Sequence, residues 1–391
     1  MPTVRLVRFM MQANPIKIAC FAIGAAVIMA GGGCSSFWAD RPAPSAPVAP
    51  VAAANRPAPS DAQRPESLNV FGEFDGVERT LAHAYGAAGF QQHTTVEEGY
   101  DCDVSVDPTG KWIVFASTRQ SEHPNLYLQR TDGVSVIQLT NDEADYAYPI
   151  FSPDGKQIAF CSTRGGNWDI YVMDTDGKNI VQVTNGPMQH VHPSFSPDGT
   201  RLVFSCFGSK SGQWELWTVD LNSGEKRMIG FGLFPSWSPA KDVDRIAYQK
   251  ARQRGSRWFS LWTLDLVDGE ARRITEVAVS SNAAIVSPSW SPDGSKLAFA
   301  TIVQPNSNNT GAKAAGQQDI WTVDADGSNR HRVTDGIGTN LSPCWAADDR
   351  IFFISDRCGA ECVWSVKYDG DAGKIKVADK SGGSESVGDA N

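Results

Sequence analysis

The chain has 391 residues, of which 41% are hydrophobic, enough to bury a sizeable core. Acidic residues outnumber basic ones by 44 to 35. Because a negatively charged surface repels phosphate backbones, we expect no nucleic-acid partner.

The first 33 residues have the pattern of an export signal. Basic residues lead into an apolar run, 18–30, that is short for a transmembrane helix. Small residues then precede Cys34, an arrangement that resembles the lipobox of bacterial lipoproteins, in which the cysteine is lipidated and becomes the mature N-terminus. Gly31 stands where that family usually has Leu, so ordinary cleavage and an uncleaved anchor remain alternatives.

The resemblance to lipoproteins also implies a location. In that family a serine after the cysteine, here Ser35, accompanies sorting to the outer membrane. We therefore expect an exported lipoprotein that faces the periplasm, with the outer membrane favoured. Without its signal the chain would keep 32 basic and 44 acidic residues, a net charge near −12.

Composition divides the remainder of the chain. Residues 34–66 are rich in Pro and Ala, which favours extended polyproline II and cannot bury a core, so we expect a disordered tether there. A short segment, 67–89, follows it, and a repeat region occupies 90–378. The Gly/Ser-rich tail at 379–391 is expected to be disordered.

The repeat region contains six related copies. The clearest begins at Tyr148, passes through Ser-Pro-Asp-Gly and an apolar run, and continues into Asp169-Ile-Tyr-Val-Met-Asp. The copies are anchored on a proline, or an equivalent alanine in the last copy, at positions 108, 153, 197, 239, 292 and 347. Each copy predicts four short antiparallel strands with a turn at Ser-Pro-Asp-Gly. Six such units predict an all-β, six-bladed β-propeller.

The sequence also indicates how the ring closes. Gln92-His-Thr-Thr95 stands nine residues before Val104, as Ile137-Gln-Leu-Thr140 stands before Pro149. It therefore occupies the fourth-strand position of a blade that precedes the first one, which in a closed ring is blade six. Residues 374–378 compete for that edge, and we favour the N-terminal strand.

These motifs resemble the TolB-type propeller repeat. Ser-Pro-Asp-Gly-Lys-x-Ile-Ala-Phe-x-Ser-x-Arg, followed by Asp-Ile-Tyr-Val-Met-Asp, carries the resemblance, which covers about 90–378. TolB proteins have an α/β domain ahead of the propeller, whereas here only about 30 residues occupy that place. The resemblance implies a monomeric propeller that binds another protein of the cell envelope.

Six cysteines remain once Cys20 leaves with the signal and Cys34 carries lipid. An even number in an oxidising compartment permits disulfides. Cys358 and Cys362 enclose only three residues, so we expect that they can bridge one hairpin loop. The pairing of the other four stays open: Cys102, Cys161, Cys206 and Cys344.

No motif indicates catalysis. The sequence lacks the Gly-x-Ser-x-Gly elbow of hydrolases and the phosphate-binding Gly-x-x-x-x-Gly-Lys loop. Acidic residues that recur in several copies, such as Asp154 and Asp176, fit hairpin turns better than ligands. We therefore expect no catalytic residue, no cofactor and no resident metal.

Positions that differ between the copies are more informative. The residue before the first proline enters the innermost strand, so it should lie near one mouth of the central channel. Across the copies these residues are Asp103, Tyr148, His192, Phe234, Ser287 and Ser342. Neighbouring loops add Asp101, Asp145, Tyr146 and His190.

Two functions suit this mixed aromatic, acidic and imidazole rim. The first is a non-enzymatic envelope scaffold that docks a protein or peptide at the channel mouth. The alternative is a carbohydrate-binding protein or metal-dependent polysaccharide lyase, in which Tyr146, Tyr148 and Phe234 stack sugars and His190 and His192 share an ion.

Overall fold

The computed structural model describes residues 89–251, 259–280, 283–303 and 318–368. Within these ranges the chain forms strands and turns without any helix, and so without a helix that could cross a bilayer. The expected signal, lipidated cysteine, tether, intervening segment and tail all fall outside the described residues, as do residues 374–378.

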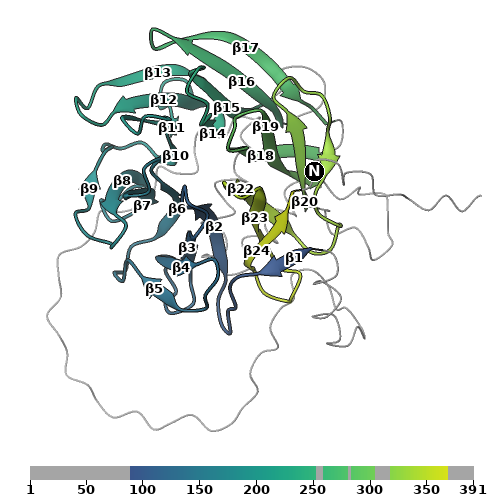
Figure 1. Ribbon diagram of the computed structural model, residues 1–391. Helices are drawn as coiled ribbons and strands as arrows, with labels where there is room; N and C mark the ends of the chain where they lie inside the picture. The colour runs from purple at the N-terminus through teal and green to yellow at the C-terminus, as the bar shows by residue number, and fades with distance from the viewer. Residues whose placement is uncertain (1–88, 252–258, 281–282, 304–317, 369–391) are drawn as a thin grey trace, which may run out of the picture. The chain divides into compact units, whose positions relative to one another are not determined.

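The described strands form six four-stranded antiparallel sheets, the blades of a propeller (Figure 1). The innermost strands of blades 1 to 6 are β2 (Asp101–Val106), β6 (Tyr146–Phe151), β10 (His190–Phe195), β14 (Leu233–Trp237), β18 (Ala283–Trp290) and β22 (Asn340–Trp345). The second strands are β3 (Trp112–Ser117), β7 (Gln157–Ser162), β11 (Arg201–Phe207), β15 (Arg245–Ala251), β19 (Lys296–Val303) and β23 (Arg350–Ser355).

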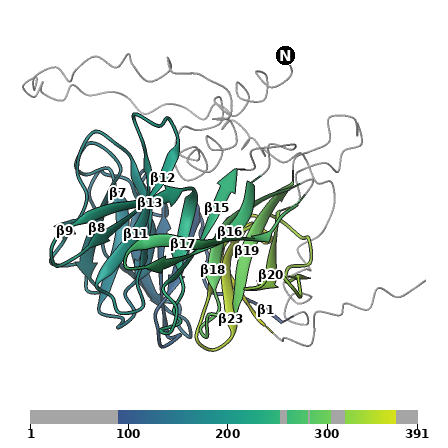
Figure 2. The same ribbon diagram turned by 90° about the horizontal axis from the view of Figure 1, so that it is seen from above.

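The two outer positions of each blade complete the sheets. The third strands are β4 (Asn125–Arg130), β8 (Asp169–Asp174), β12 (Trp214–Asp220), β16 (Phe259–Val267), β20 (Gln318–Asp324) and β24 (Cys362–Lys367). The fourth strands are β5 (Val136–Gln138), β9 (Val181–Gln182), β13 (Lys226–Phe231), β17 (Glu270–Ala278), β21 (His331–Arg332) and β1 (Phe90–Gln92). Figure 2 shows β16 and β17, the longest outer pair, side by side in blade 4. The expected all-β, six-bladed propeller is confirmed.

The repeated motifs explain the blades. In Ser-Pro-Asp-Gly of blade 2, the N–H of Gly155 donates to the carbonyl of Ser152 at 2.9 Å, which closes the expected turn. Gly155 has a φ of +70°, in the left-handed region that glycine adopts without a steric penalty. The second strand that follows is buried at five of its six positions, as its continuous apolar run predicted.

Hydrogen bonds join neighbouring blades near the axis. The innermost strands contact one another in order around the ring, and β22 contacts β2. A serine two residues after the expected channel residue accepts a hydrogen bond from the next blade's innermost strand. The three pairs are Ser105 with the N–H of Phe151 (3.3 Å), Ser194 with that of Trp237 (3.0 Å) and Ser289 with that of Trp345 (3.0 Å). These bonds join the innermost strands in three pairs, in blades 1 and 2, 3 and 4, and 5 and 6.

The N-terminal strand closes the ring. Phe90 pairs with Val366 and Gln92 with Trp364, so β1 is the fourth strand of blade six, as favoured from the sequence. The Thr94 hydroxyl accepts from the N–H of Val363 at 2.8 Å and donates to Asp101 at 2.6 Å. Thr140, Thr184 and Thr334 accept from the corresponding third-strand N–H in blades 1, 2 and 5, and each donates to the side chain of the residue before that N–H. The threonine that takes this position is therefore Thr94, one residue earlier than the spacing had placed it.

Arg357 holds the closing strand from the other side. Its guanidinium carbon lies 4.0 Å from the centroid of the Phe90 ring on β1 and 5.3 Å from that of Trp364 on β24. The same guanidinium donates to the Asn340 side chain at 3.0 Å. The Arg357 side chain has no exposed surface, so these cation–π contacts are shielded from water. Cation–π contacts are stronger when they are shielded in this way.

Replacing Thr94 with Val should weaken ring closure. The substitution leaves the buried N–H of Val363 without its acceptor and removes one donor from Asp101, which should lower the free energy of unfolding by about 1–3 kcal/mol. Thr95→Val is the matched control, because the Thr95 side chain is exposed, and it should change stability by less than about 0.5 kcal/mol. Urea unfolding compares them; equal effects would show that Thr94 does not carry the closure.

Candidate functional site

The same backbone distortion occurs in the innermost strand of every blade. The pairing between first and second strands shifts register at one point, which marks a β-bulge. The first residue of each bulge has a φ between 49° and 56° although none is glycine. These residues are the six expected to face the channel: Asp103, Tyr148, His192, Phe234, Ser287 and Ser342.

The sequence explains where this distortion falls. Five of the six residues precede a proline, which has no N–H for the ladder and is tolerated in sheets mainly at edges and bulges. A left-handed conformation costs a non-glycine residue roughly 1–2 kcal/mol. Strain repeated at one level of all six blades is maintained by the surrounding sheets, and strained backbone of this kind clusters at binding and switch sites.

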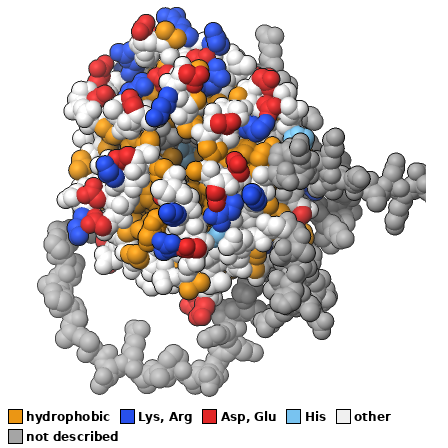
Figure 3. All heavy atoms as spheres, viewed as in Figure 1, with side chains coloured by type: hydrophobic (Ala, Val, Ile, Leu, Met, Phe, Trp, Pro, Cys, Tyr) orange, Lys and Arg blue, Asp and Glu red, His pale blue; other side chains and the backbone are white. Residues whose placement is uncertain are grey.

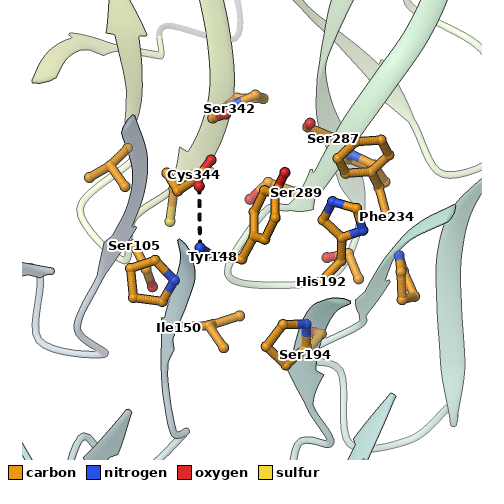
Figure 4. A pocket seen from close by; sticks show the side chains of 18 residues that line it. Ser105, Tyr148, Ile150, His192, Ser194, Phe234, Ser287, Ser289, Ser342 and Cys344 are labelled. Carbon is orange, nitrogen blue, oxygen red and sulfur yellow. Dashed lines mark hydrogen bonds between the residues drawn. The ribbon is translucent and has the colours of Figure 1, made fainter. Parts of the chain in front are cut away.

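The bulges surround a cavity of about 150 Å³. Three consecutive residues of each innermost strand line it, beginning with the bulge residue (Figure 4). A space of this size has room for several water molecules. It is therefore large enough for one side chain or the end of an extended segment, and too small for a folded domain.

The lining differs between the two sides of the ring. Blades 2, 3 and 4 supply three aromatic rings, with His192 between Tyr148 and Phe234 (Figure 4). The ring centroids of Tyr148 and His192 are 4.2 Å apart, and those of His192 and Phe234 are 4.0 Å apart. Blades 5 and 6 supply the small hydroxyl side chains of Ser287 and Ser342. An aromatic wall thus faces a polar one.

His192 is the least satisfied polar side chain of the cavity. It is only 5% exposed, and neither ring nitrogen has a hydrogen-bond partner among the described residues. Burial lowers the pKa of His192 to about 3, so the ring is neutral at physiological pH and offers one donor and one acceptor. An unpaired buried polar group costs about 1–3 kcal/mol.

Asp103 is the one acidic side chain among the residues that line the cavity, and the lining contains no Lys or Arg. Burial raises the pKa of Asp103 to about 7. The N–H of Tyr148 donates to its carboxylate at 3.2 Å, which opposes that rise. The cavity is consequently neutral below pH 7 and carries one negative charge above it.

The other four candidate residues lie outside the cavity lining and have different partners. Each makes a hydrogen bond of 2.8 Å: Asp101 with Arg119, Asp145 with His123, Tyr146 with Asp142 and His190 with Asp169. The two histidines therefore have separate roles, His190 within blade 3's contact to blade 2 and His192 at the axis. Within the described ranges, no three His, Cys, Asp or Glu side chains are grouped closely enough to hold a metal ion.

Sequence reasoning missed part of the lining. The residue two positions after each bulge also faces the cavity: Ser105, Ile150, Ser194, Ser236, Ser289 and Cys344. Residues two apart on a strand share a face, so their spacing from the expected channel residue was a signal that could have found them. Burial raises the pKa of the Cys344 thiol to about 11, so it stays protonated.

The cysteine pair of blade six lies away from this cavity. Cys358 and Cys362 are both free thiols in the structure, the first exposed and the second buried. A hydrogen bond from Cys362 lowers the pKa of the Cys358 thiol, so Cys358 is the more nucleophilic of the two. Their disulfide remains a prediction.

Asp103→Asn should change how stability depends on pH. Because the folded-state pKa of Asp103 is raised from 3.8 to about 7, its protonated form stabilises the fold fully below pH 3.8, and this contribution is lost as the pH rises through 7. Asparagine does not titrate, so the variant should gain stability relative to the native chain between pH 4 and pH 8. At about 1.4 kcal/mol for each pKa unit, the upper limit is about 4 kcal/mol.

Chemical unfolding at both pH values measures this gain. His192 titrates in both proteins, so its contribution cancels in the difference. If the native chain and Asp103→Asn differed in stability by the same amount at pH 4 and pH 8, the raised pKa of Asp103 would be contradicted.

Family models match two parts of the chain. The model described as the Tricorn protease N-terminal beta propeller domain matches residues 109–260, and the TolB beta propeller domain matches residues 232–387. The Tol-Pal system protein TolB of Bordetella pertussis is 30% identical over 161 residues, 32% of this chain and 35% of that protein. Its counterpart in Anaeromyxobacter dehalogenans is 29% identical over 139 residues, 34% of this chain and 27% of that protein. The chain spans about a third of the length of these curated relatives.

A solved structure shows the same fold. TolB from Acinetobacter baumannii superposes with a TM-score of 0.50 at 17% identity, covering 67% of this chain and 65% of that one. The blade topology, the repeated motifs and the family matches agree. The described part of this chain is a six-bladed β-propeller of the TolB type.

Proposed function

We propose that this protein is a non-enzymatic binding or scaffold module of the cell envelope that docks a protein or peptide at its axial cavity. The observation that carries the proposal is His192, a buried ring with two unpartnered nitrogens, which lies between Tyr148 and Phe234 at the cavity wall. A peptide presents both an N–H and a C=O at each residue, so it can supply the acceptor and the donor that this ring needs.

The dimensions of the cavity favour one inserted segment over a flat interface. A space of about 150 Å³ admits one side chain of an extended chain, with an apolar part against Tyr148 and Phe234 and polar atoms toward Ser287 and Ser342. Because the blades hold these side chains in place before binding, little conformational entropy is lost when the segment enters. The face in Figure 3 has hydrophobic patches around the middle of the ring.

The relatives give the proposal its context. Two proteins named for the Tol-Pal system are similar to this chain over about a third of their length. We propose, by analogy with them, that this chain also binds a protein of the cell envelope. The carbohydrate and lyase alternative relied on Tyr146 and His190 as well. Tyr146 is buried within blade 2, and His190 is bonded to Asp169, so neither side chain contributes to the cavity. Tyr148 and Phe234, the other two aromatic residues of that alternative, do line the cavity.

A benzophenone amino acid at position 234 should cross-link the partner in intact cells. We expect one principal adduct, and His192→Ala or Tyr148→Ala should reduce it at least fivefold, because these side chains form the wall next to Phe234. The matched control carries the benzophenone at Phe231, an exposed aromatic position on β13 of the neighbouring blade. An adduct that forms equally from position 231, or that survives both cavity substitutions, would contradict docking at the axis.

We propose further that the chain is exported and anchored by a lipid at Cys34, facing the periplasm from the outer membrane. Cells grown with an alkyne fatty acid should label the full-length chain, and Cys34→Ser should abolish both the label and the co-sedimentation with outer membranes. Cys20→Ser is the control, because Cys20 belongs to the segment that is removed. Label that persists in Cys34→Ser would refute the anchor.

A further inference from the structure

We propose that the segment entering the axial cavity presents a primary ammonium group, which pairs with Asp103. The inference rests on the proposed function and specifies its chemistry. A primary ammonium has two sources in a protein partner, the side chain of a lysine and a free N-terminus, and the shared chemistry is what the cavity recognises.

The charge distribution at the axis carries this step. Asp103 is the single ionisable group of the lining that becomes charged near neutral pH, since Cys344 stays protonated and His192 stays neutral. Its hydrogen-bond partner in the structure is the backbone N–H of Tyr148, and no Lys or Arg of the described residues forms an ion pair with it. Asp101, two residues earlier, has both Arg119 and Thr94 as partners. Of these two acids on β2, only Asp103 is available to an incoming cation.

The remaining lining suits the other donors of an ammonium group. A primary ammonium carries three N–H donors. One of the neutral ring nitrogens of His192 can accept a hydrogen bond, and so can the hydroxyls of Ser287 and Ser342. The faces of Tyr148 and Phe234 attract cations. All of these groups lie at the bulge positions of their blades and line one cavity.

The groups that face Asp103 predict a pH dependence. On neighbouring elements these are the Tyr148 N–H of β6, Cys161 of β7, Ser342 and Cys344 of β22 and, across the channel, His192 of β10. Burial raises the pKa of the Cys161 and Cys344 thiols. Burial lowers the pKa of the His192 imidazole. Between pH 5.5 and pH 8 only Asp103 among them changes charge, so ammonium binding should strengthen as the pH rises through 7.

Calorimetry with model amides tests the inference on the full-length chain. The probes are Nα-acetyl-lysine amide for the side-chain source, alanine amide for the N-terminal source and Nα-acetyl-norleucine amide as the uncharged analogue. At pH 8 we expect at least one amine to bind tenfold or more tightly than norleucine amide, and this preference should fall about tenfold at pH 5.5. The stronger of the two amines identifies the source once the affinity of alanine amide is referred to its protonated fraction, because an α-amino group is about half neutral at pH 8. Equal binding of all three probes would overturn the inference.

Two variants and a control locate the effect. Asp103→Asn should abolish the preference for amines at pH 8 without weakening norleucine amide, and Phe234→Leu should reduce amine affinity severalfold. Asp132→Asn is the control, because Asp132 is an exposed acid at the outer edge of the same blade, and it should leave every affinity unchanged. Amine binding that survives Asp103→Asn in a folded protein would contradict the proposal.

These results separate the inference from the proposed function. If the partner cross-links at position 234 and Asp103→Asn leaves the cross-link intact, docking stands and the ammonium is wrong. If the amines bind through Asp103 and no partner cross-links, the site is confirmed and docking of a protein is wrong.

Discussion

The pairing of β1 with β24 is the contact on which the rest of the structure depends. A propeller blade buries its faces only against neighbouring blades, so an open ring would expose blades 1 and 6 together with the wall of the channel. Here the closing strand comes from the opposite end of the repeat region, and Thr94 and Arg357 fasten it through buried hydrogen bonds and cation–π contacts. The axial cavity exists because this closure brings blade 6 against blade 1.

Closure alone would produce a channel lined by regular strands. The six bulges change its character, because they turn one side chain per blade toward the axis at a common level. Each bulge is strained, and the serine bonds between blades hold the strands that contain it. The scaffold residues repeat from blade to blade, whereas the residues at the bulges do not. The proposed binding function therefore depends on the bulge residues, which differ between blades, and the repeated residues hold the blades that carry them.

Much of this could be predicted from the sequence. Turn motifs, apolar runs and spacing predicted six blades and the closing strand, because each is a local pattern with a fixed structural consequence. The residue before the first proline, which the sequence placed near the channel, lines the axial cavity. The sequence could not separate His192 from His190, because alternate residues of a regular strand share a face, and the bulge between Val191 and Ser194 breaks that rule. Nor could spacing show that Thr94, and not Thr95, accepts the N–H of Val363, because the choice depends on one residue of loop length.

In the proposed function, the unsatisfied ring of His192 marks the place where a partner's chain enters. The most direct test is the structure of the full-length protein purified gently from its own cell envelope together with what it retains. We expect an extended segment in the cavity with a polar atom within about 3.2 Å of a His192 ring nitrogen. A retained partner that lies only on the outer blades, with the His192 nitrogens bonded to water or to nothing, would contradict it.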